Sequence, residues 1–186
     1  MTEEWKPQVQ DPDRLAALER SGLIGLFGDD AFDRLLELAI AVTGAPRGVI
    51  AMVDAKYTTA ISGYGFPEGL ALFAPIDLSF CRFVVGYGRP FLVEDALNDP
   101  RTIGDPAIDA FHAVAWIGFP VEDSRGSVLG NFCLMDASPR EWTPLDIQTV
   151  ATLAQAASTE IALREERAGA RAARHSLTEL EVKRDA

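Results

Sequence analysis

Residues 113–135 read AVAWIGFPVEDSRGSVLGNFCLM, which is two strongly apolar runs around a short polar turn. The runs cover 113–121 and 127–135, and the turn between them contains Gly126. Apolar runs of strand length that flank a glycine-containing turn predict a β-hairpin. This hairpin is the best-defined pair of strands in the sequence, and the other elements are placed around it.

Three other segments have the character of strands. Residues 48–53 form a short apolar run, and residues 57–62 are rich in β-forming residues and follow after a connection of hairpin length. Residues 90–94 read PFLVE, a short strand that begins with proline, where no ladder hydrogen bond needs a donor. Because hairpins lie at both ends of this set of strands, the sheet is predicted to be antiparallel.

Two amphipathic helices are expected before the first strand. Asp11 and Pro12 have the positions of an N-cap and a first helical residue, and Gly22 ends that helix. A second helix begins at residues 29–30, continues with apolar residues at helical spacing and ends at Gly44. Both helices need a surface to cover.

The segments between the strands are less regular. Residues 65–77 contain Gly and Pro and predict a loop, whereas residues 78–85 predict a short helix with Asp77 as its cap. Residues 95–110 are rich in turn residues and predict a long loop with room for one helical turn. A loop of this length in a compact domain is usually functional or mobile.

A long helix is expected after the hairpin. Thr143 is its predicted N-cap, Pro144 its first residue, and Asp146 completes an approximate capping box. After Leu163 the composition changes to charged helix formers with little apolar bulk, so residues 164–186 are predicted to be a linker helix that needs a partner.

These elements together predict an α+β fold in which the terminal helices cover one face of a central antiparallel sheet. The loops and short helices are left for the other face, where they would enclose a pocket. The predicted organisation is an N-terminal extension over residues 1–10, one domain over 11–163 and the charged helical linker over 164–186.

Charge and hydropathy exclude several classes of protein. The chain of 186 residues has 17 basic and 28 acidic side chains, a net charge of −11, and no basic patch, which argues against nucleic acid or an anionic membrane as a primary partner. No apolar run approaches the ~20 residues of a membrane span. The N-terminus lacks a signal-peptide pattern, so a cytoplasmic location is predicted.

The two cysteines, Cys81 and Cys133, are far apart in the sequence and lie in apolar surroundings. They lack CxxC spacing and nearby pairs of histidines, so a structural zinc site is not expected. We expect buried, reduced and unpaired thiols.

Eight short motifs follow one another along most of the chain. They are SGL (21–23), AFDRL (31–35), TGAP (43–46), SFC (79–81), VEDALNDPR (93–101), WIGFPV (116–121), GSVLGNFCLMD (126–136) and PREWTP (139–144). In this order and spacing the chain resembles a GAF domain, a PAS-related fold found at the N-termini of bacterial sensor kinases, phosphatases and diguanylate cyclases. The resemblance implies a regulatory, small-molecule-sensing domain whose C-terminal helix leads to an effector, with a histidine kinase as the leading expectation.

No enzymatic activity is expected in this chain. The GxSxG, Walker and HExxH motifs are absent, and the two histidines, His112 and His175, stand alone. The free methionine sulfoxide reductases, which are enzymes of the GAF family, need several cysteines clustered at one site. Cys81 and Cys133 do not match the positions of that motif.

The resemblance also bears on cofactors, whose identity is left unknown. Bilins attach in related domains through a Cys that is commonly followed by His, and here Arg82 follows Cys81, so a bilin is not expected. The Asn-Lys…Asp signature of cyclic-nucleotide-binding GAF domains is absent. Haem-binding GAF domains use a histidine shortly before a Gly-x-Pro strand, and His112 precedes Gly118-Phe119-Pro120 at similar spacing. Haem at His112 therefore stays open beside a His112 that only packs near aromatic neighbours.

Aromatic residues are concentrated around the expected pocket, with a few polar groups and the two thiols nearby. The candidate ligand-binding residues are Phe66, Phe80, Cys81, Asp95, Phe111, His112, Trp116, Phe132 and Cys133. An apolar cavity with few polar groups is typical of a ligand site, although the same side chains would also fill a core. Two functions therefore stay open, a sensor of a small effector and a dimerisation scaffold with a vestigial pocket.

The terminal helices predict a homodimer. Beyond Leu163, small and apolar residues recur at heptad positions, namely Ala170, Ala173, Leu177 and Leu180. We expect a parallel dimer in which the opening helix around Leu15 and Leu18 and the C-terminal helix form a small bundle.

Overall fold

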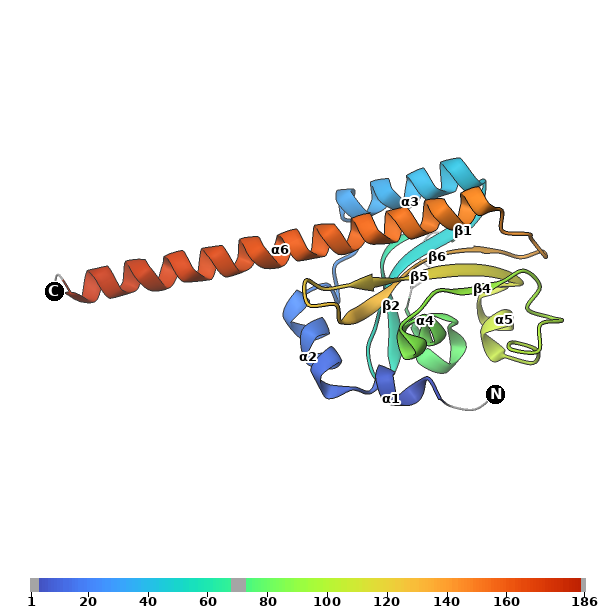
Figure 1. Ribbon diagram of the computed structural model, residues 1–186, viewed down its shortest axis with the longest axis horizontal. Coiled ribbons are helices and arrows are strands. Elements are labelled where there is room, and N and C mark those ends of the chain that lie inside the picture. Colours follow the sequence, from blue (N-terminus) through green and yellow to red (C-terminus); the bar gives the residue numbers. More distant parts are fainter. Residues whose placement is uncertain (1–3, 68–72, 185–186) are drawn as a thin grey trace.

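Six strands form one antiparallel sheet in the computed structural model, which describes residues 4–67 and 73–184, with side chains as far as residue 174 (Figure 1). The strands are β1 (Arg47–Val53), β2 (Tyr57–Tyr64), β3 (Phe73–Pro75), β4 (Phe91–Val93), β5 (Ala115–Glu122) and β6 (Val128–Asp136). Their order across the sheet is β3-β2-β1-β6-β5-β4, so β1 and β6 are the central strands.

The hairpin predicted over residues 113–135 is present as β5 and β6. It pairs Ala115 with Asp136 at one end and Glu122 with Val128 at the other. Strands β1, β2 and β4 lie where the apolar runs predicted them. The predicted antiparallel sheet is therefore confirmed.

Strand β3 lies inside the segment predicted to be a loop, residues 65–77. It pairs with the edge of β2, where Thr58 lies opposite Ala74. A strand of three residues shows no alternation that a sequence pattern could reveal, and it forms because the edge of β2 offers unpaired backbone groups. The loop prediction is wrong at this point.

The helix ends follow the local sequence signals. In α2 (Pro12–Ser21) the Asp11 carboxylate accepts from the Arg14 N–H at 2.8 Å, and Gly22 ends the helix in a left-handed conformation. In α3 (Asp30–Thr43), Asp29 is the N-cap and Gly44 the C-cap. The long helix α6 (Pro144–Arg184) begins with reciprocal bonds between Thr143 and Asp146, at 3.0 and 3.2 Å, which confirms the predicted capping box.

The short helices differ in detail from their predictions. Helix α4 (Cys81–Tyr87) begins at Cys81, not at residue 78, and Asp77 belongs to a separate 3-10 turn, η1 (Ile76–Leu78). The extended backbone of Ser79 separates the two elements. Helix α5 (Pro106–Phe111) is the helical turn expected in the long loop, with Asp105 as its N-cap.

The segment predicted to be an N-terminal extension contains a short helix, α1 (Lys6–Val9), that packs on the domain. Trp5 and Val9 are both buried in the core. Trp5 lies so close to Gly86 of α4 that a Cβ at Gly86 would come within 2.3 Å of the Trp5 Cβ. The packed domain therefore begins at Trp5, before the predicted boundary at residue 11.

Helices cover both faces of the sheet and form two separate cores (Figure 1). Helices α3 and α6 pack on one face around Phe32 and Phe132, and α2 adds Leu18 to this core. Helices α4 and α5, with α1, pack on the other face around Phe83 and Trp116. This arrangement confirms the predicted α+β architecture with the long helices on one face and the short helices on the other.

Helix α6 continues well past the sheet, as Figure 1 shows. Near the edge of the domain, Arg164 forms two bonds with Asp29 at 2.8 and 2.9 Å, and the pKa of the Asp29 carboxyl is lowered mainly by this contact. The Glu165 carboxylate accepts from the Ser124 N–H at 3.1 Å. Among the described residues, no helix has an apolar stretch long enough to cross a bilayer.

Candidate ligand-binding site

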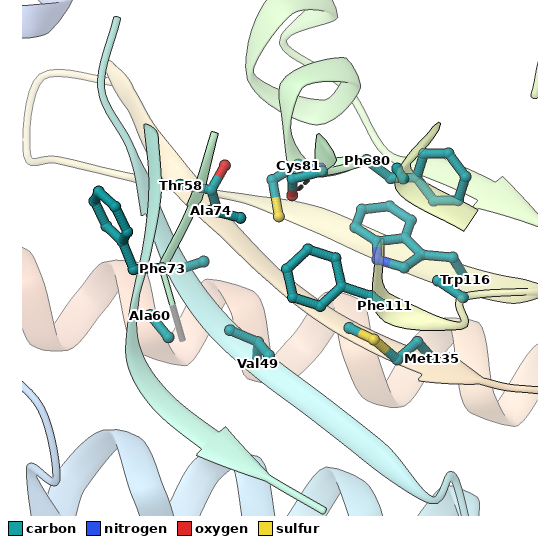
Figure 2. Close-up of a pocket in the computed structure, with 14 residues that line it drawn as sticks. Val49, Thr58, Ala60, Phe73, Ala74, Phe80, Cys81, Phe111, Trp116 and Met135 are labelled. Carbon is teal, nitrogen blue, oxygen red and sulfur yellow. Dashed lines mark hydrogen bonds between the residues drawn. The ribbon is translucent and has the colours of Figure 1, made fainter. Parts of the chain in front are cut away.

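A cavity of about 40 Å³ lies between the sheet and the layer of short helices (Figure 2). Its walls come from β1, β2, β3, β5 and β6, from the Ser79–Cys81 segment and from α5. The lining side chains are mostly small or aromatic: Val49, Ala51, Thr58, Ala60, Phe73, Ala74, Ser79, Phe80, Cys81, Ala107, Phe111, Ala113, Trp116 and Met135. A water molecule needs roughly 10–15 Å³ of such space, so the cavity has room for a few waters or one small solute.

Four of the residues selected from the sequence line this cavity together. Phe80 and Cys81 enter from the start of α4, Phe111 from the end of α5, and Trp116 from β5, as Figure 2 shows. The rings of Phe80 and Trp116 meet edge to face, with their centroids 6.1 Å apart. The aromatic cluster that the sequence suggested is therefore real for this part of the site.

Gly118 leaves the space that the indole of Trp116 occupies. The two residues are two apart on β5 and so share one face of the sheet. A Cβ at Gly118 would lie 2.3 Å from the Trp116 ring, so only glycine lets the ring lie flat along the strand. The glycine of the WIGFPV motif thus has a packing role at the wall of the cavity.

Phe132 does not belong to the site, and that prediction is corrected. It lies on the opposite face of the sheet, fully buried in the core beneath α3 and α6. Neighbouring residues on a strand point to opposite faces, so Phe132 and Cys133 could not both face the cavity side. Cys133 is the residue on that side, buried in the same core as Cys81 and Trp116.

Phe66 and Asp95 are also absent from the lining. Phe66 packs against the edge of the core, with the Arg47 guanidinium 5.9 Å from its ring centre. The Asp95 carboxylate accepts from the Leu97 N–H at 3.1 Å and from the Asn98 amide at 2.7 Å. Asp95 therefore stabilises its own turn rather than facing a ligand.

His112 has a backbone role. It ends α5 in a left-handed conformation, with φ of 48°, and its carbonyl oxygen accepts from Arg47 at 2.8 Å. Its side chain is not part of the cavity lining. Because a haem needs several hundred Å³ and an axial ligand that faces it, the residues present do not fit a haem here.

The residue after Cys81 also fails to fit a bilin site. The Arg82 guanidinium is buried, forms an ion pair with Asp105 and donates to the Ser79 carbonyl at 2.7 Å. It therefore connects α4 to the segments on either side and does not line the cavity. His175 lies beyond the residues whose side chains are described.

The polar groups of the site are ones that the sequence patterns did not single out. Thr58 lines the cavity, and its hydroxyl is buried without a hydrogen-bond partner among the described residues. The carboxamide of Asn131 on β6 is completely buried; among the described residues it makes no hydrogen bond and has the two thiols as polar neighbours. Asn131 could have been noticed as the one amide in the apolar run 127–135. Thr58 could not, because threonine is ordinary in a strand.

The two cysteines, far apart in sequence, are neighbours in the fold. The Cys81 and Cys133 side chains are both free and both buried, and the two thiols interact with one another. This contact lowers the pKa of Cys81, helped by Ser79 and Asn131, whereas burial raises the pKa of Cys133 well above its usual value. Within the described residues, no group of three or more His, Cys, Asp or Glu side chains could hold a metal ion.

Comparison with known families agrees with this architecture. The profile of the GAF domain family matches residues 28–161, which is most of the chain. The protein belongs to the GAF domain family. The resemblance seen in the sequence motifs is therefore confirmed, and so is the fold that it implied.

The proteins to which this GAF domain is similar include signalling proteins. A cyclic di-GMP phosphodiesterase of Pseudomonas aeruginosa is 27% identical over 143 residues, which are 75% of this chain and 23% of that protein. The GAF domain of PixJ from Thermosynechococcus elongatus, in its blue-light-absorbing form, superposes with a TM-score of 0.63 at 13% identity, covering 89% of this chain and 97% of that domain. A domain described as part of a two-component sensor histidine kinase from Sinorhizobium meliloti gives a TM-score of 0.56 at 18% identity, covering 77% and 94%.

Proposed function

We propose that this GAF domain is a regulatory module that binds a small uncharged effector in the cavity beneath α4 and α5. The observation that carries the proposal is Thr58 in the cavity wall, whose buried hydroxyl has no partner in the part of the chain that the structure describes. An unpaired buried hydroxyl costs about 1–3 kcal/mol, a cost that a ligand hydrogen bond would remove. The aromatic and small aliphatic lining supplies the apolar contacts that such a site needs.

The volume limits the class of effector. A cavity of about 40 Å³ suits a molecule of a few heavy atoms. No charged side chain of the described residues lines it, so a charged effector would lack a partner there. The proposed effector is therefore a small amide, alcohol or ketone, and the role proposed for the chain is regulatory rather than catalytic.

The effect of binding would pass to a neighbouring effector domain through α6, which packs on the other face of the same sheet. An effector shifts an equilibrium only as far as it prefers one of two arrangements. The likeness to a cyclic di-GMP phosphodiesterase and to part of a sensor histidine kinase supports output enzymes of these classes. A histidine kinase remains the first choice of the proposal.

Replacing Trp116 by Ala tests the proposed site. The change should lower the unfolding free energy by about 3–5 kcal/mol, as expected for a large buried aromatic side chain. It should also remove the stabilisation that a small neutral ligand gives the wild type, about 2.7 kcal/mol at a hundred times its dissociation constant. The measurement is thermal unfolding with a panel of small amides, alcohols and ketones.

The matched control is Phe132→Ala, an equally buried aromatic on the opposite face of the sheet. It should lose a similar amount of stability but keep the ligand response. Thr58→Val is a milder variant, which should fold normally and weaken the response. If no compound raises the stability of the wild-type protein more than it raises that of the Trp116→Ala variant, the domain is a scaffold and the sensing proposal is wrong.

The dimer remains a proposal, and the structure changes which residues would form it. Leu18 is buried inside the domain, so α2 cannot offer it to a second copy. Large apolar side chains are exposed instead on α3 and α6, with Leu38 at 51%, Val42 at 45% and Leu145 at 60%. These helices cover the same face of the sheet (Figure 1). Leu177 and Leu180 lie beyond the described side chains.

Removing residues 164–186 should weaken the dimer, because the two copies of the charged helix are proposed to pair along their length. The expected result in sedimentation at tens of micromolar is a dimer for residues 1–186 and a shift toward monomer for a chain that ends at Leu163. The double change Leu38→Glu with Val42→Glu should have the same effect. Ile103→Glu, at an exposed apolar residue on the long loop, is the control that should stay dimeric. Monomers throughout would contradict the proposal.

A further inference from the structure

Cys81 and Cys133 lie in the core between the sheet and the short helices, one on a helix and the other on a strand. Cys81 is the first residue of α4, and Cys133 lies in the middle of the central strand β6. Both side chains belong to one core, with exposed fractions of 5% and 0%. Both cysteines are free, so the structure holds them as two interacting thiols.

Asn131 lies beside both sulfur atoms. It is on the same face of β6 as Cys133, two residues before it, and it is completely buried. Neither its oxygen nor its nitrogen has a hydrogen bond within the described part of the chain. An amide left unpaired in an apolar core costs free energy, and its N–H groups are suited to a neighbouring thiolate, which accepts hydrogen bonds better than a thiol does.

Access to the two sulfur atoms is unequal. Cys81 lines the cavity, and Figure 2 shows its side chain pointing into the space between α4 and the sheet. Cys133 is not part of the lining. A small neutral molecule in the cavity would therefore reach Cys81 first, while Cys133 would be reached only through Cys81.

The acid–base properties agree with this order. The neighbouring polar groups of Cys133, Ser79 and Asn131 favour the ionised form and so lower the pKa of Cys81. The thiolate is the nucleophilic form of cysteine, so Cys81 is the better nucleophile of the pair. Burial raises the pKa of Cys133, so its thiol stays protonated until a base accepts the proton.

We propose that Cys81 and Cys133 form a reversible oxidation site, in which a small neutral peroxide that enters the cavity converts the two thiols into an intramolecular disulfide. The proposal does not depend on the effector proposed above. It adds a covalent modification site to the domain, with hydrogen peroxide as the representative oxidant.

The chemistry balances in two steps. The Cys81 thiolate attacks one oxygen of hydrogen peroxide, the O–O bond breaks, hydroxide leaves, and Cys81 becomes a sulfenic acid, a two-electron oxidation of its sulfur. Cys133 then gives its proton to the leaving hydroxyl and attacks the Cys81 sulfur, so that the S–O bond breaks, the disulfide forms and water leaves. The sum is two thiols and one peroxide to one disulfide and two waters. A dithiol such as dithiothreitol reverses it by exchange.

The experiment treats the reduced full chain with a few equivalents of hydrogen peroxide and follows intact mass and free thiols. The wild type should lose 2 Da and both thiols as a monomeric chain, and dithiothreitol should restore both. Cys133→Ala should stop at a sulfenic acid of +16 Da that dimedone traps. Cys81→Ala should leave Cys133 unoxidised. Asn131→Leu should keep the fold and slow disulfide formation about tenfold, because the thiolate loses a donor.

Three results would overturn the proposal. One is a wild type that keeps both thiols under peroxide while the urea-unfolded chain reacts. Another is a disulfide that forms only between chains, seen as a doubled mass without reductant. The last is over-oxidation of the wild type by +32 or +48 Da with no −2 Da product. Circular dichroism of both cysteine variants and of Asn131→Leu establishes that each is folded, so a lack of reaction in Cys81→Ala reports on chemistry.

Discussion

Replacing Arg14 by Ala should lower the unfolding free energy by about 3–5 kcal/mol, although no ligand or active group touches this residue. Arg14 is 2% exposed, and its guanidinium donates to the Val53 carbonyl at 2.8 Å and to the Val128 carbonyl at 3.4 Å. It also donates to the carbonyls of Gln8 and Val9, on the α1 side. Each of these carbonyl oxygens, three of them in buried contacts, would lose a donor in the variant, and the space left by the side chain would add a packing cost.

The position of these acceptors explains why the effect should be so large. Val53 ends β1 and Val128 begins β6, so a single guanidinium holds the ends of both central strands and the N-terminal segment together. Urea unfolding monitored by circular dichroism measures the change, and the melting temperature should fall by roughly 10 °C. Arg14→Lys should be less destabilising than Arg14→Ala but still less stable than the wild type. A single ammonium group cannot donate to all the carbonyls that the three guanidinium nitrogens reach.

Arg20→Ala on the same helix is the matched control. Arg20 is exposed, so its replacement should change stability by no more than about 0.5 kcal/mol. Equal effects of the two substitutions would show that Arg14 is not a structural centre of the fold.

The sequence predicts most of the fold because its strongest signals are local. Asp11 and Thr143 cap their helices as the patterns indicated, and the hairpin of β5 and β6 follows directly from the apolar runs around Gly126. Such features depend on residues within one or two turns of chain. They can therefore be inferred without knowing what lies next to them in space.

Arg14 illustrates what cannot be inferred. In the sequence it is a charged residue of an amphipathic helix, which normally points to solvent. Its role depends on carbonyl groups of Val53 and Val128, far away along the chain. The same limitation applies to α1 and β3, whose few residues show no periodicity and which form only because the domain offers them a surface.

Only part of the candidate site could be predicted, again because local patterns do not show how distant segments are placed. The aromatic residues of the SFC and WIGFPV motifs do meet at the cavity, because their motifs lie at the ends of elements on one face. Choosing between Phe132 and Cys133 required the register of β6, which apolar runs without alternation do not reveal. The pairing of Cys81 with Cys133 required the position of α4 over the central strands, which is a tertiary property.

The second large effect is expected at the buried ion pair between Arg82 and Asp105. Both side chains are 5% exposed. The Asp105 carboxylate also accepts from the Ala107 N–H at 2.9 Å as the cap of α5, and the Arg82 guanidinium lies 4.3 Å from the ring centre of Phe83. Asp105→Ala would leave a buried, unpaired cation and an uncapped helix, so a loss of about 3–5 kcal/mol is expected.

A double-mutant cycle separates the ion pair from the cap. Asp105→Asn keeps an N-cap oxygen but removes the charge, and it should still be clearly destabilising because Arg82 stays buried. Adding Arg82→Met should reduce that loss, since the variant then has neither buried charge. The neighbouring pair of Asp99 and Arg101 is the control, because Arg101 is 54% exposed and the pair should contribute no more than about 1 kcal/mol.

The outcome also bears on the cavity, because Arg82 and Asp105 fix two of its walls. Arg82 donates to the Asp77 carbonyl at 3.1 Å and to that of Ser79, just before the cavity residues Phe80 and Cys81, while Asp105 anchors the helix that carries Phe111. Asp105→Ala should therefore release both walls and speed reaction of the Cys81 thiol with a bulky maleimide at least tenfold, whereas Asp99→Ala should leave it slow. If Asp105→Ala unfolds at the same urea concentration as Asp99→Ala and its thiols stay protected, the buried pair does not hold the cavity closed.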